Sequence, residues 1–258
     1  MKVGTSSLSY SNGRLNFHRI KVLASVLTTL RNRGKQVILV TSGAIGVGAG
    51  RLGYAERTRE VGVKQALAAI GQAELMKIYR KFFEGFNQKV AQVLLTKDVV
   101  SIPSRNMNAR RTLVRLLEMN IIPIINENDT IATCEIVFGD NDTLSAIVAA
   151  LAGADLLIML SDIDGLFDSD PRKNKSAKII HSVYEITPEL EKLASGTCSS
   201  LGTGGMVTKI SAAKMCFDNG IDCIITNGAD PTVIFNILEG EMVGTHFSVS
   251  GSKVKQIV

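Results

Sequence analysis

Glycines, threonines and one lysine crowd the segment GTGGMVTK, residues 202–209, in a pattern suited to holding a phosphate. The P-loop signature opens its helix with Gly-Lys-Ser/Thr, whereas here the glycines cluster early and Thr208 precedes the lysine. Apolar residues follow helical spacing after Gly204, so the glycines stand at a helix N-terminus, where free N–H groups and the helix dipole favour an anion. Lys209 lies in the second turn, and its side chain leans back toward that anion. The segment therefore predicts a phosphate site; the alternative is a glycine turn followed by a surface lysine.

Acids and amides gather in two other segments, INENDT (125–130) and FGDNDTLSA (138–146). Such side chains can receive an ammonium group, orient lysines or bind a metal ion. The spacing of an EF-hand loop is absent. A helix N-cap would explain Asp142 or Thr143 alone and would leave the other members unexplained. The members of this set are Asn126, Glu127, Asn128, Asp129, Asp140, Asn141 and Asp142.

Two further features in the first part of the chain, a lysine and a turn, could take part in binding or catalysis. Lys2 is a charge within the first apolar run, where burial is costly unless the ammonium is paired; the alternative is an exposed lysine on an edge strand. The turn TSGA, residues 41–44, follows the run QVILV, and its N–H groups and hydroxyls could hold a carboxylate or phosphate or merely cap a helix. The motif GAGRLG, residues 48–53, matches G-x-G-x-x-G but begins well after the strand that ends near Val40, so we predict no dinucleotide site there.

The elements that must position these residues are short apolar runs separated by helical patterns. Amphipathic spacing predicts helices over Asn16–Arg31 and Gly62–Phe86, and residues 167–178 form a polar surface loop or hairpin. Continuous apolar strands between helices indicate an α/β fold with a parallel sheet covered on both faces. Polar clusters follow the strands directly, and we expect them to meet at the carboxyl edge of the sheet. The clearest strand runs are QVILVTSG, KVAQVLLT, IIPIINEN, DLLIMLSD and DCIITNG.

Composition narrows the class of protein. The chain has 258 residues, 45% hydrophobic and 21% charged, with 29 basic against 24 acidic residues, which is ordinary for a globular protein. Aromatic residues make up only 5% and no basic cluster is found, so we predict no nucleic-acid partner. The four cysteines show no C-x-x-C spacing, and no apolar stretch is long enough to span a bilayer. We therefore expect a cytoplasmic protein with reduced thiols.

Taken together, KVGTSSLS, ILVTSGAIGVG, PIINENDT, FGDNDTLSA, LSDIDGLF, DPR and GTGGMVTKISAA resemble the amino acid kinase family in order and spacing over nearly the whole chain. Within that family they resemble the member that opens proline biosynthesis. The resemblance implies an αβα sandwich with a mainly parallel central sheet, and transfer of phosphate from ATP, with Mg²⁺, to the side-chain carboxylate of L-glutamate. It also implies a homo-oligomer (dimer or tetramer) and feedback inhibition by proline. Many members of the family carry a C-terminal PUA domain, whereas here we expect one kinase domain over residues 1–258 without a PUA domain.

The resemblance assigns roles to individual residues of this chain. Lys2 and Lys209 flank the transferred phosphoryl group, and Asp142 holds the two lysines in place. The glutamate-binding set is Ser42, Asn126, Asp129, Asp140 and Asn141. The ATP-binding set is Gly4, Ser161, Asp162, Thr203, Gly204, Gly205, Met206, Val207, Thr208 and Lys209. The protein ligands of the metal ion stay unassigned.

Two other functions compete with this interpretation. A sibling kinase could act on acetylglutamate, aspartate, carbamate or UMP, although the paired INEND and GDND segments favour free glutamate, whose ammonium must be received. A non-catalytic sensor of proline or glutamate could keep the same fold, but both lysines and the glycine-rich helix start are present, which favours an enzyme.

Overall fold

The computed structural model describes residues 1–10, 14–54, 60–131, 141–195 and 205–249. The chain divides into two compact units. Residues Val3–Phe138 form the N-terminal unit, and residues Met1–Lys2 with Gly139–Val258 form the C-terminal unit. Strand β1, Lys2–Val3, therefore gives one residue to each unit.

Three parallel strands of the N-terminal unit lie in the order β3-β4-β2. These are β3 (Val90–Leu95), β4 (Ile122–Glu127) and β2 (Leu39–Val40). In the register of the sheet Leu95 lies opposite Glu127, so both strands end at the same edge. The polar residues after β2 and β4 therefore follow the carboxyl ends of neighbouring strands, as the sequence predicts for this unit.

Strand β2 is shorter than the apolar run that predicts it. The run covers residues 36–43, but regular pairing with β4 is confined to Leu39 and Val40, prolonged by the bond from Thr41 N to Ile125 O at 2.8 Å. Gly43 has φ 100°, a left-handed conformation that glycine adopts without strain. This residue turns the chain out of the sheet and directly into the next helix.

Two helices of the N-terminal unit, α2 and α4, follow the amphipathic patterns predicted for them. The α2 helix begins after Asn16, whose side chain accepts from the N–H of Arg19 at 3.1 Å. Pro103 at the first position of α5 fits there because it has no N–H to satisfy. The motif GAGRLG lies within and just after α3, which confirms that it is not a dinucleotide loop. The helical segments are α1 (Thr5–Leu8), α2 (Phe17–Asn32), α3 (Ala44–Leu52), α4 (Val61–Glu84), the 3₁₀ turn η1 (Lys97–Val99) and α5 (Pro103–Glu118).

Helices α3 and α4 pack backbone against backbone. A Cβ atom added at Gly71 would lie 1.7 Å from the carbonyl oxygen of Ala44, and one at Gly48 would lie 2.0 Å from that of Leu67. Both positions therefore exclude any side chain. This contact fixes the turn before α3 against the middle of α4.

Gly71→Ala should destabilise the protein by about 1–3 kcal/mol or more, because the methyl group forces α3 and α4 apart. Gly62→Ala in the same helix is the control: its Cβ meets nothing within 4 Å, so it should stabilise by about 0.5–1 kcal/mol. Denaturant unfolding of both variants measures the two shifts. Equal shifts in one direction would contradict the close backbone contact.

The strands of the C-terminal unit continue from β5 in the order β5-β7-β8-β6. Pairs β5–β7 and β6–β8 are parallel, and β7–β8 is antiparallel. Ser161 lies opposite Asn227, so β5 and β7 end at one edge and the polar residues after them follow it. The strands are β5 (Leu156–Ser161), β6 (Ser182–Val183), β7 (Asp222–Asn227) and β8 (Thr245–Phe247).

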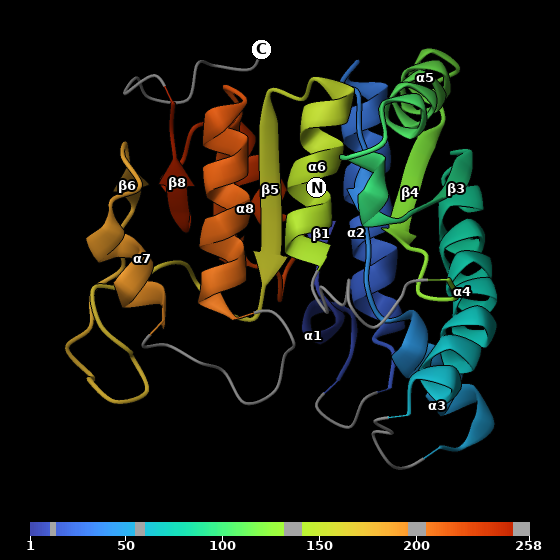
Figure 1. Ribbon diagram of the computed structural model, residues 1–258, viewed down its shortest axis with the longest axis horizontal. Helices are drawn as coiled ribbons and strands as arrows, with labels where there is room; N and C mark the ends of the chain where they lie inside the picture. The colour runs from blue at the N-terminus through green and yellow to red at the C-terminus, as the bar shows by residue number, and fades with distance from the viewer. Residues whose placement is uncertain (11–13, 55–59, 132–140, 196–204, 250–258) are drawn as a thin grey trace. The chain divides into compact units, whose positions relative to one another are not determined.

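Two helices of the C-terminal unit, α6 and α8, pack against each other, and Figure 1 shows them in yellow-green and orange on either side of β5 in the view. Their inner faces join the apolar strands in one buried cluster that includes Ala146, Met159, Ile210, Ala213 and Phe247. The polar loop 167–178 is pinned at its base by an antiparallel bridge between residues 167 and 179, as a surface hairpin requires. The helices are α6 (Asn141–Ala152), α7 (Pro188–Ser195), α8 (Met206–Asp218) and α9 (Val233–Leu238).

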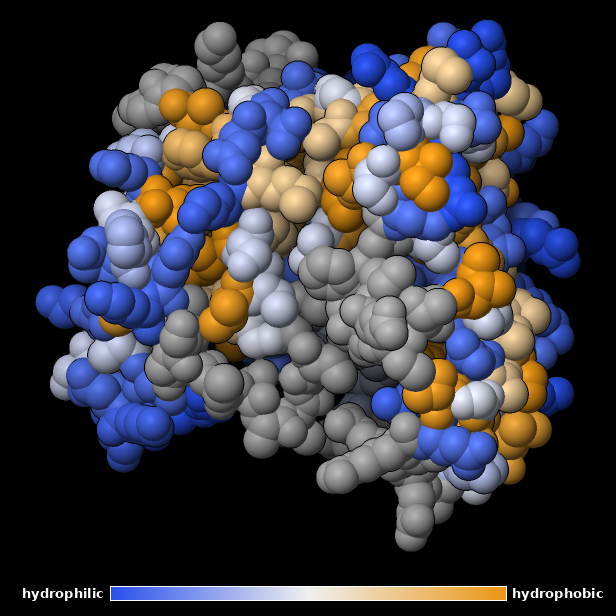
Figure 2. All heavy atoms as spheres, viewed as in Figure 1, coloured by the Kyte–Doolittle hydropathy of each residue, from blue (hydrophilic) through white to orange (hydrophobic). Residues whose placement is uncertain are grey.

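On the face that Figure 2 shows, orange hydrophobic residues lie over α3 and α4 at the lower right. Among the described helices, none is both long enough and apolar enough to cross a membrane. The large hydrophobic residues that are exposed in α3, just after it and in α4 are Leu52, Tyr54, Val61 and Ile70.

The predicted fold class is confirmed. Parallel pairing dominates the described strands, helices accompany them, and the order of elements is that of an α/β chain. The extent of the kinase domain, residues 1–258 without a PUA domain, stays a prediction.

Candidate functional site

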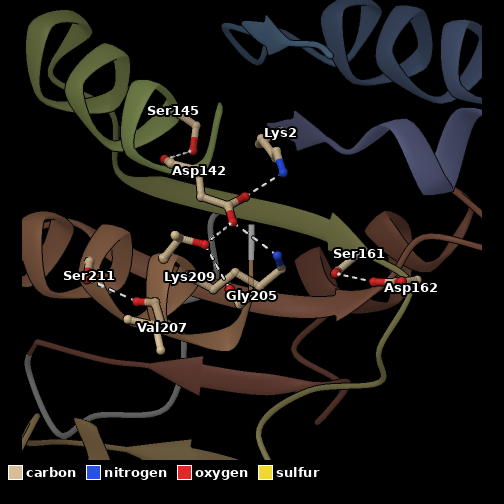
Figure 3. Close-up of polar contacts among 10 residues, drawn as sticks. Lys2, Asp142, Ser145, Ser161, Asp162, Gly205, Val207, Lys209 and Ser211 are labelled. Carbon is tan, nitrogen blue, oxygen red and sulfur yellow. Dashed lines mark hydrogen bonds and ion pairs between the residues drawn. The ribbon is translucent and has the colours of Figure 1, made fainter. Parts of the chain in front are cut away.

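One carboxylate holds two lysines in the interior of the C-terminal unit. Asp142, in the first turn of α6, is fully buried. The Nζ atom of Lys2 lies 2.5 Å from its Oδ1 atom, and the Nζ atom of Lys209 lies 3.0 Å from its Oδ2 atom. Figure 3 shows the two ammonium groups reaching this carboxylate from β1 and from α8. Residues separated in the sequence by 140 and 67 positions are thus brought to one point.

The burial of both lysines decides between the alternatives that the sequence left open. Lys2 is only 5% exposed, so the alternative interpretation, an exposed lysine on an edge strand, is wrong. Lys209 is only 6% exposed, so a surface lysine is wrong as well. Asp142 belongs to the helix itself, and its side chain is committed to the lysines rather than to an N-cap. Buried ammonium groups are stable here because each has a carboxylate oxygen as partner.

The local charge favours an anion. Two ammonium groups against one carboxylate leave this buried cluster with a net charge of +1. Gly205 caps α8 without a side-chain hydrogen bond, so the first N–H groups of a 13-residue helix add partial positive charge. The hydroxyl of Thr208 lies 3.1 Å from Asp142 Oδ2 and 2.8 Å from the carbonyl oxygen of Gly205, which ties the helix start to the carboxylate.

Other residues of the predicted ATP-binding set lie at strand and helix ends. Ser161 ends β5, and its hydroxyl contacts Asp162 Oδ1 at 3.1 Å, while its carbonyl accepts from the N–H of Gly228 at 2.7 Å. Met206 and Val207 open α8. Gly4 lies two residues after Lys2, at the start of α1, and is part of the N-terminal unit. Thr203 and Gly204 lie outside the described residues.

A cavity of about 290 Å³ opens in the N-terminal unit. This volume is at the lower end of the range for small-molecule sites, roughly 300–1,000 Å³. Its lining includes small residues of α4, two residues of β3, and the polar residues at the end of β4 and just after it. Burial raises the pKa of Asp129 above its usual range, so a cation bound beside this carboxylate would be favoured. The polar lining residues are Gln72, Gln92, Glu127, Asn128, Asp129 and Thr130.

The predicted glutamate-binding set divides between several places. Asp129 lines the cavity, and Ser42 lies in the turn before α3, whose first residue, Ala44, also lines it. Asn126 is 2% exposed, and its side chain is bonded beneath the cavity wall rather than being part of the lining. Asn141 begins α6 in the C-terminal unit, beside Asp142. Asp140 lies outside the described residues.

Sequence reasoning missed Gln72, a polar residue of the cavity wall. It belongs to the buried face of α4, together with Ala68, Leu75 and Tyr79, at the helical spacing of four, three and seven residues. A glutamine in an otherwise apolar stripe is the signal that could have found it. Its side chain accepts from Asn126 Nδ2 at 2.8 Å.

Metal ligands do not gather in the part of the chain that the structure describes. No three histidine, cysteine, aspartate or glutamate side chains there are placed to hold an ion. Both carboxylate oxygens of Asp142 are already used by lysines.

Comparison with known proteins defines the class first: the chain belongs to the amino acid kinase family, whose model matches residues 1–227. Among curated relatives, it is 53% identical over 251 residues to the glutamate 5-kinase of Clostridium perfringens, covering 96% of this chain and 93% of the relative. It is 54% identical over 252 residues to the glutamate 5-kinase of Listeria monocytogenes, covering 96% and 91%.

Solved structures support the same fold at lower identity. The carbamate kinase of Giardia lamblia matches with a TM-score of 0.68 and 15% identity, covering 96% of each chain. The UMP kinase of Bacillus anthracis matches with a TM-score of 0.65 and 19% identity, covering 97% of this chain and 95% of that one. At such identities the likeness concerns the fold alone.

Proposed function

We propose that this chain transfers the γ-phosphoryl group of ATP to the side-chain carboxylate of L-glutamate, giving ADP and L-glutamyl 5-phosphate, the first step of proline biosynthesis. The observation that carries the proposal is the buried Lys2–Asp142–Lys209 cluster. The high identity to relatives called glutamate 5-kinase supports the choice of substrate.

Lys2 and Lys209 act on the transferred group. One oxygen of the glutamate side-chain carboxylate forms a bond to the γ-phosphorus, the bond to the bridging oxygen breaks, and its electron pair leaves with ADP. Negative charge spreads over the equatorial oxygens during this step, and two ammonium groups with a net excess of one positive charge stabilise it. The carboxylate is already ionised at neutral pH, so no general base is needed.

Asp142 positions the two lysines. In the absence of ATP it neutralises one charge and keeps both Nζ atoms at a fixed place, so little rearrangement is needed when the phosphates arrive. The start of α8, from Gly205 to Thr208, supplies N–H groups for the phosphates, and we assign Ser161 and Asp162 to nucleotide binding with Thr203 and Gly204. When bound together with ATP, Mg²⁺ would neutralise phosphate charge, and the residues that would hold it stay unassigned.

The cavity of the N-terminal unit is assigned to glutamate. Its acidic residues suit the α-ammonium group, and the partly buried carboxylate of Asp129, whose pKa burial raises, would be favoured in its charged form by such a partner. We assign Ser42, Asn126, Asp140 and Asn141 to the same substrate, as the sequence predicts. Proline, an α-amino acid without the side-chain carboxylate, would compete there as a feedback inhibitor.

The oligomeric state and the cellular location of the protein also belong to the proposal. We propose a homo-oligomer, a dimer or tetramer, and a cytoplasmic location. The free and buried thiols of Cys216 and Cys223 support a reducing compartment, and burial raises the pKa of the Cys223 thiol well above its usual value.

A coupled assay of ADP release tests the proposal across L-glutamate, acetylglutamate, aspartate, carbamate and UMP. Hydroxylamine added to the reaction traps an acyl phosphate as the γ-hydroxamate, which identifies the phosphorylated group. Turnover of glutamate with hydroxamate formation is expected. Turnover of acetylglutamate but not glutamate would assign the chain to a sibling activity, and binding of glutamate or proline without turnover would show a sensor.

A further inference from the structure

The side chain of Gln72 combines burial with an unused hydrogen-bond donor. It is 8% exposed, and its Nε2 atom has no hydrogen-bond partner among the described residues. Gln72 also lines the cavity of the N-terminal unit. A buried amide nitrogen without an acceptor is unfavourable unless a ligand supplies one.

The neighbouring Asn126 determines which atom of the Gln72 side-chain amide, the nitrogen or the oxygen, is available to a ligand. Asn126 Oδ1 accepts from the main-chain N–H of Glu127 at 3.0 Å, so the other end of its amide, Nδ2, must be a donor. That donor lies 2.8 Å from Gln72 Oε1. Rotating the Gln72 amide by 180° would set two donors against each other. The backbone of β4 thus determines, through Asn126, that Gln72 presents nitrogen rather than oxygen to a ligand.

The charges of the cavity match the two groups on the α-carbon of an amino acid. Glu127 and Asp129 offer negative oxygens, which suit an ammonium group. An α-carboxylate bonded to the same carbon needs a donor nearby, and Gln72 Nε2 is a neutral donor on the same cavity. The side-chain carboxylate must stay free to attack phosphorus, so it is not the partner that this donor serves.

We propose that Gln72 Nε2 donates a hydrogen bond to the α-carboxylate of glutamate, and that Asn126 is a positioning residue that orients Gln72. This assignment rests on the proposed function, because it names a contact of the same substrate. It also changes the role predicted for Asn126, which acts through Gln72 instead of contacting glutamate directly.

Steady-state kinetics of Gln72→Met tests the contact. Loss of a hydrogen bond to a charged group should raise KM for glutamate by about tenfold to a hundredfold, with kcat and KM for ATP unchanged. The matched control is Gln88→Met. Gln88 is also 8% exposed, but its Nε2 donates to the carbonyl oxygens of Lys89 and Asn120, so this variant should lower stability and leave KM for glutamate unchanged.

Two conservative variants separate recognition from packing. Gln72→Glu keeps an acceptor for Asn126 but removes the donor, so it should disfavour glutamate and improve use of L-isoglutamine, whose α-amide N–H can donate to the new carboxylate. Asn126→Asp replaces the donor that faces Gln72 by an acceptor, which turns the Gln72 amide around and should raise KM for glutamate with Gln72 still in place.

The outcomes distinguish this inference from the proposed function. Wild-type protein that does not turn over glutamate overturns both. Wild-type turnover with an unchanged KM in Gln72→Met, or an equal rise in Gln88→Met, overturns the role of Gln72 alone. If Gln72→Glu uses isoglutamine and glutamate in the same ratio as the wild-type protein, the α-carboxylate is not the group that residue 72 recognises.

Discussion

Lys209→Met is expected to lower kcat by about a thousandfold, because in the proposed function it removes one of the two ammonium groups that stabilise the transferring phosphoryl group. The fold should persist. Asp142 keeps Lys2 as its partner at 2.5 Å, so the buried cluster changes from a net charge of +1 to neutrality rather than to an unpaired charge. Rates of ADP release with saturating glutamate and ATP measure the loss, and thermal unfolding checks the fold.

Lys214→Met is the matched control for this variant. Lys214 lies in the same helix, but it is exposed and pairs with Glu191 at 2.6 Å on the surface. Its loss should leave kcat unchanged and alter stability by no more than about 1 kcal/mol. If Lys209→Met retained wild-type kcat, phosphoryl transfer would not depend on the cluster.

Asp142→Leu should have the largest effect on stability. It leaves the ammonium groups of Lys2 and Lys209 buried without their shared carboxylate, and breaking a buried pair in this way costs about 3–5 kcal/mol. For a chain of this size the expected fall in Tm is roughly 6–20 °C. Calorimetry measures it, with Glu191→Gln as a control that removes a carboxylate from an exposed pair.

A second substitution should partly reverse that loss. Asp142→Leu combined with Lys209→Met leaves one buried lysine without the Asp142 carboxylate instead of two, so the double variant should unfold at a higher temperature than Asp142→Leu alone. Residues that share a partner give such non-additive effects. Losses that simply add would mean that the lysines find other counter-ions when Asp142 is replaced.

Much of the fold could be predicted because local patterns and final structure agree. The apolar runs before Glu127, Ser161 and Asn227 become strands of six residues that end where the runs end. Helix α4 follows its amphipathic pattern to within two residues at its end. The short strands β6 and β8 lack such a pattern, since two or three residues carry no periodicity and their pairing depends on neighbours distant in sequence.

The candidate site shows the same division between local and long-range information. The glycines and Lys209 indicate an anion site by themselves, since a helix N-terminus is a local feature. The sharing of one carboxylate by Lys2 and Lys209, by contrast, requires β1, α6 and α8 to meet. Gln72 was missed because its unused donor is defined by Asn126, which lies 54 positions away.

Because Asp142 pairs with both lysines, the order in which the three residues are lost during evolution matters. A descendant could lose Lys209 first and keep a neutral, stable pair of Lys2 with Asp142, becoming inactive while still folded. Loss of Asp142 first would bury two lysines without their shared carboxylate and raise the unfolded fraction before any compensating change arose. Because of this epistasis, Asp142, which in the proposed function contacts no substrate, is the last of the three residues that can be replaced. Loss of Lys209 alone could convert the kinase into a folded protein that binds its ligands without catalysis.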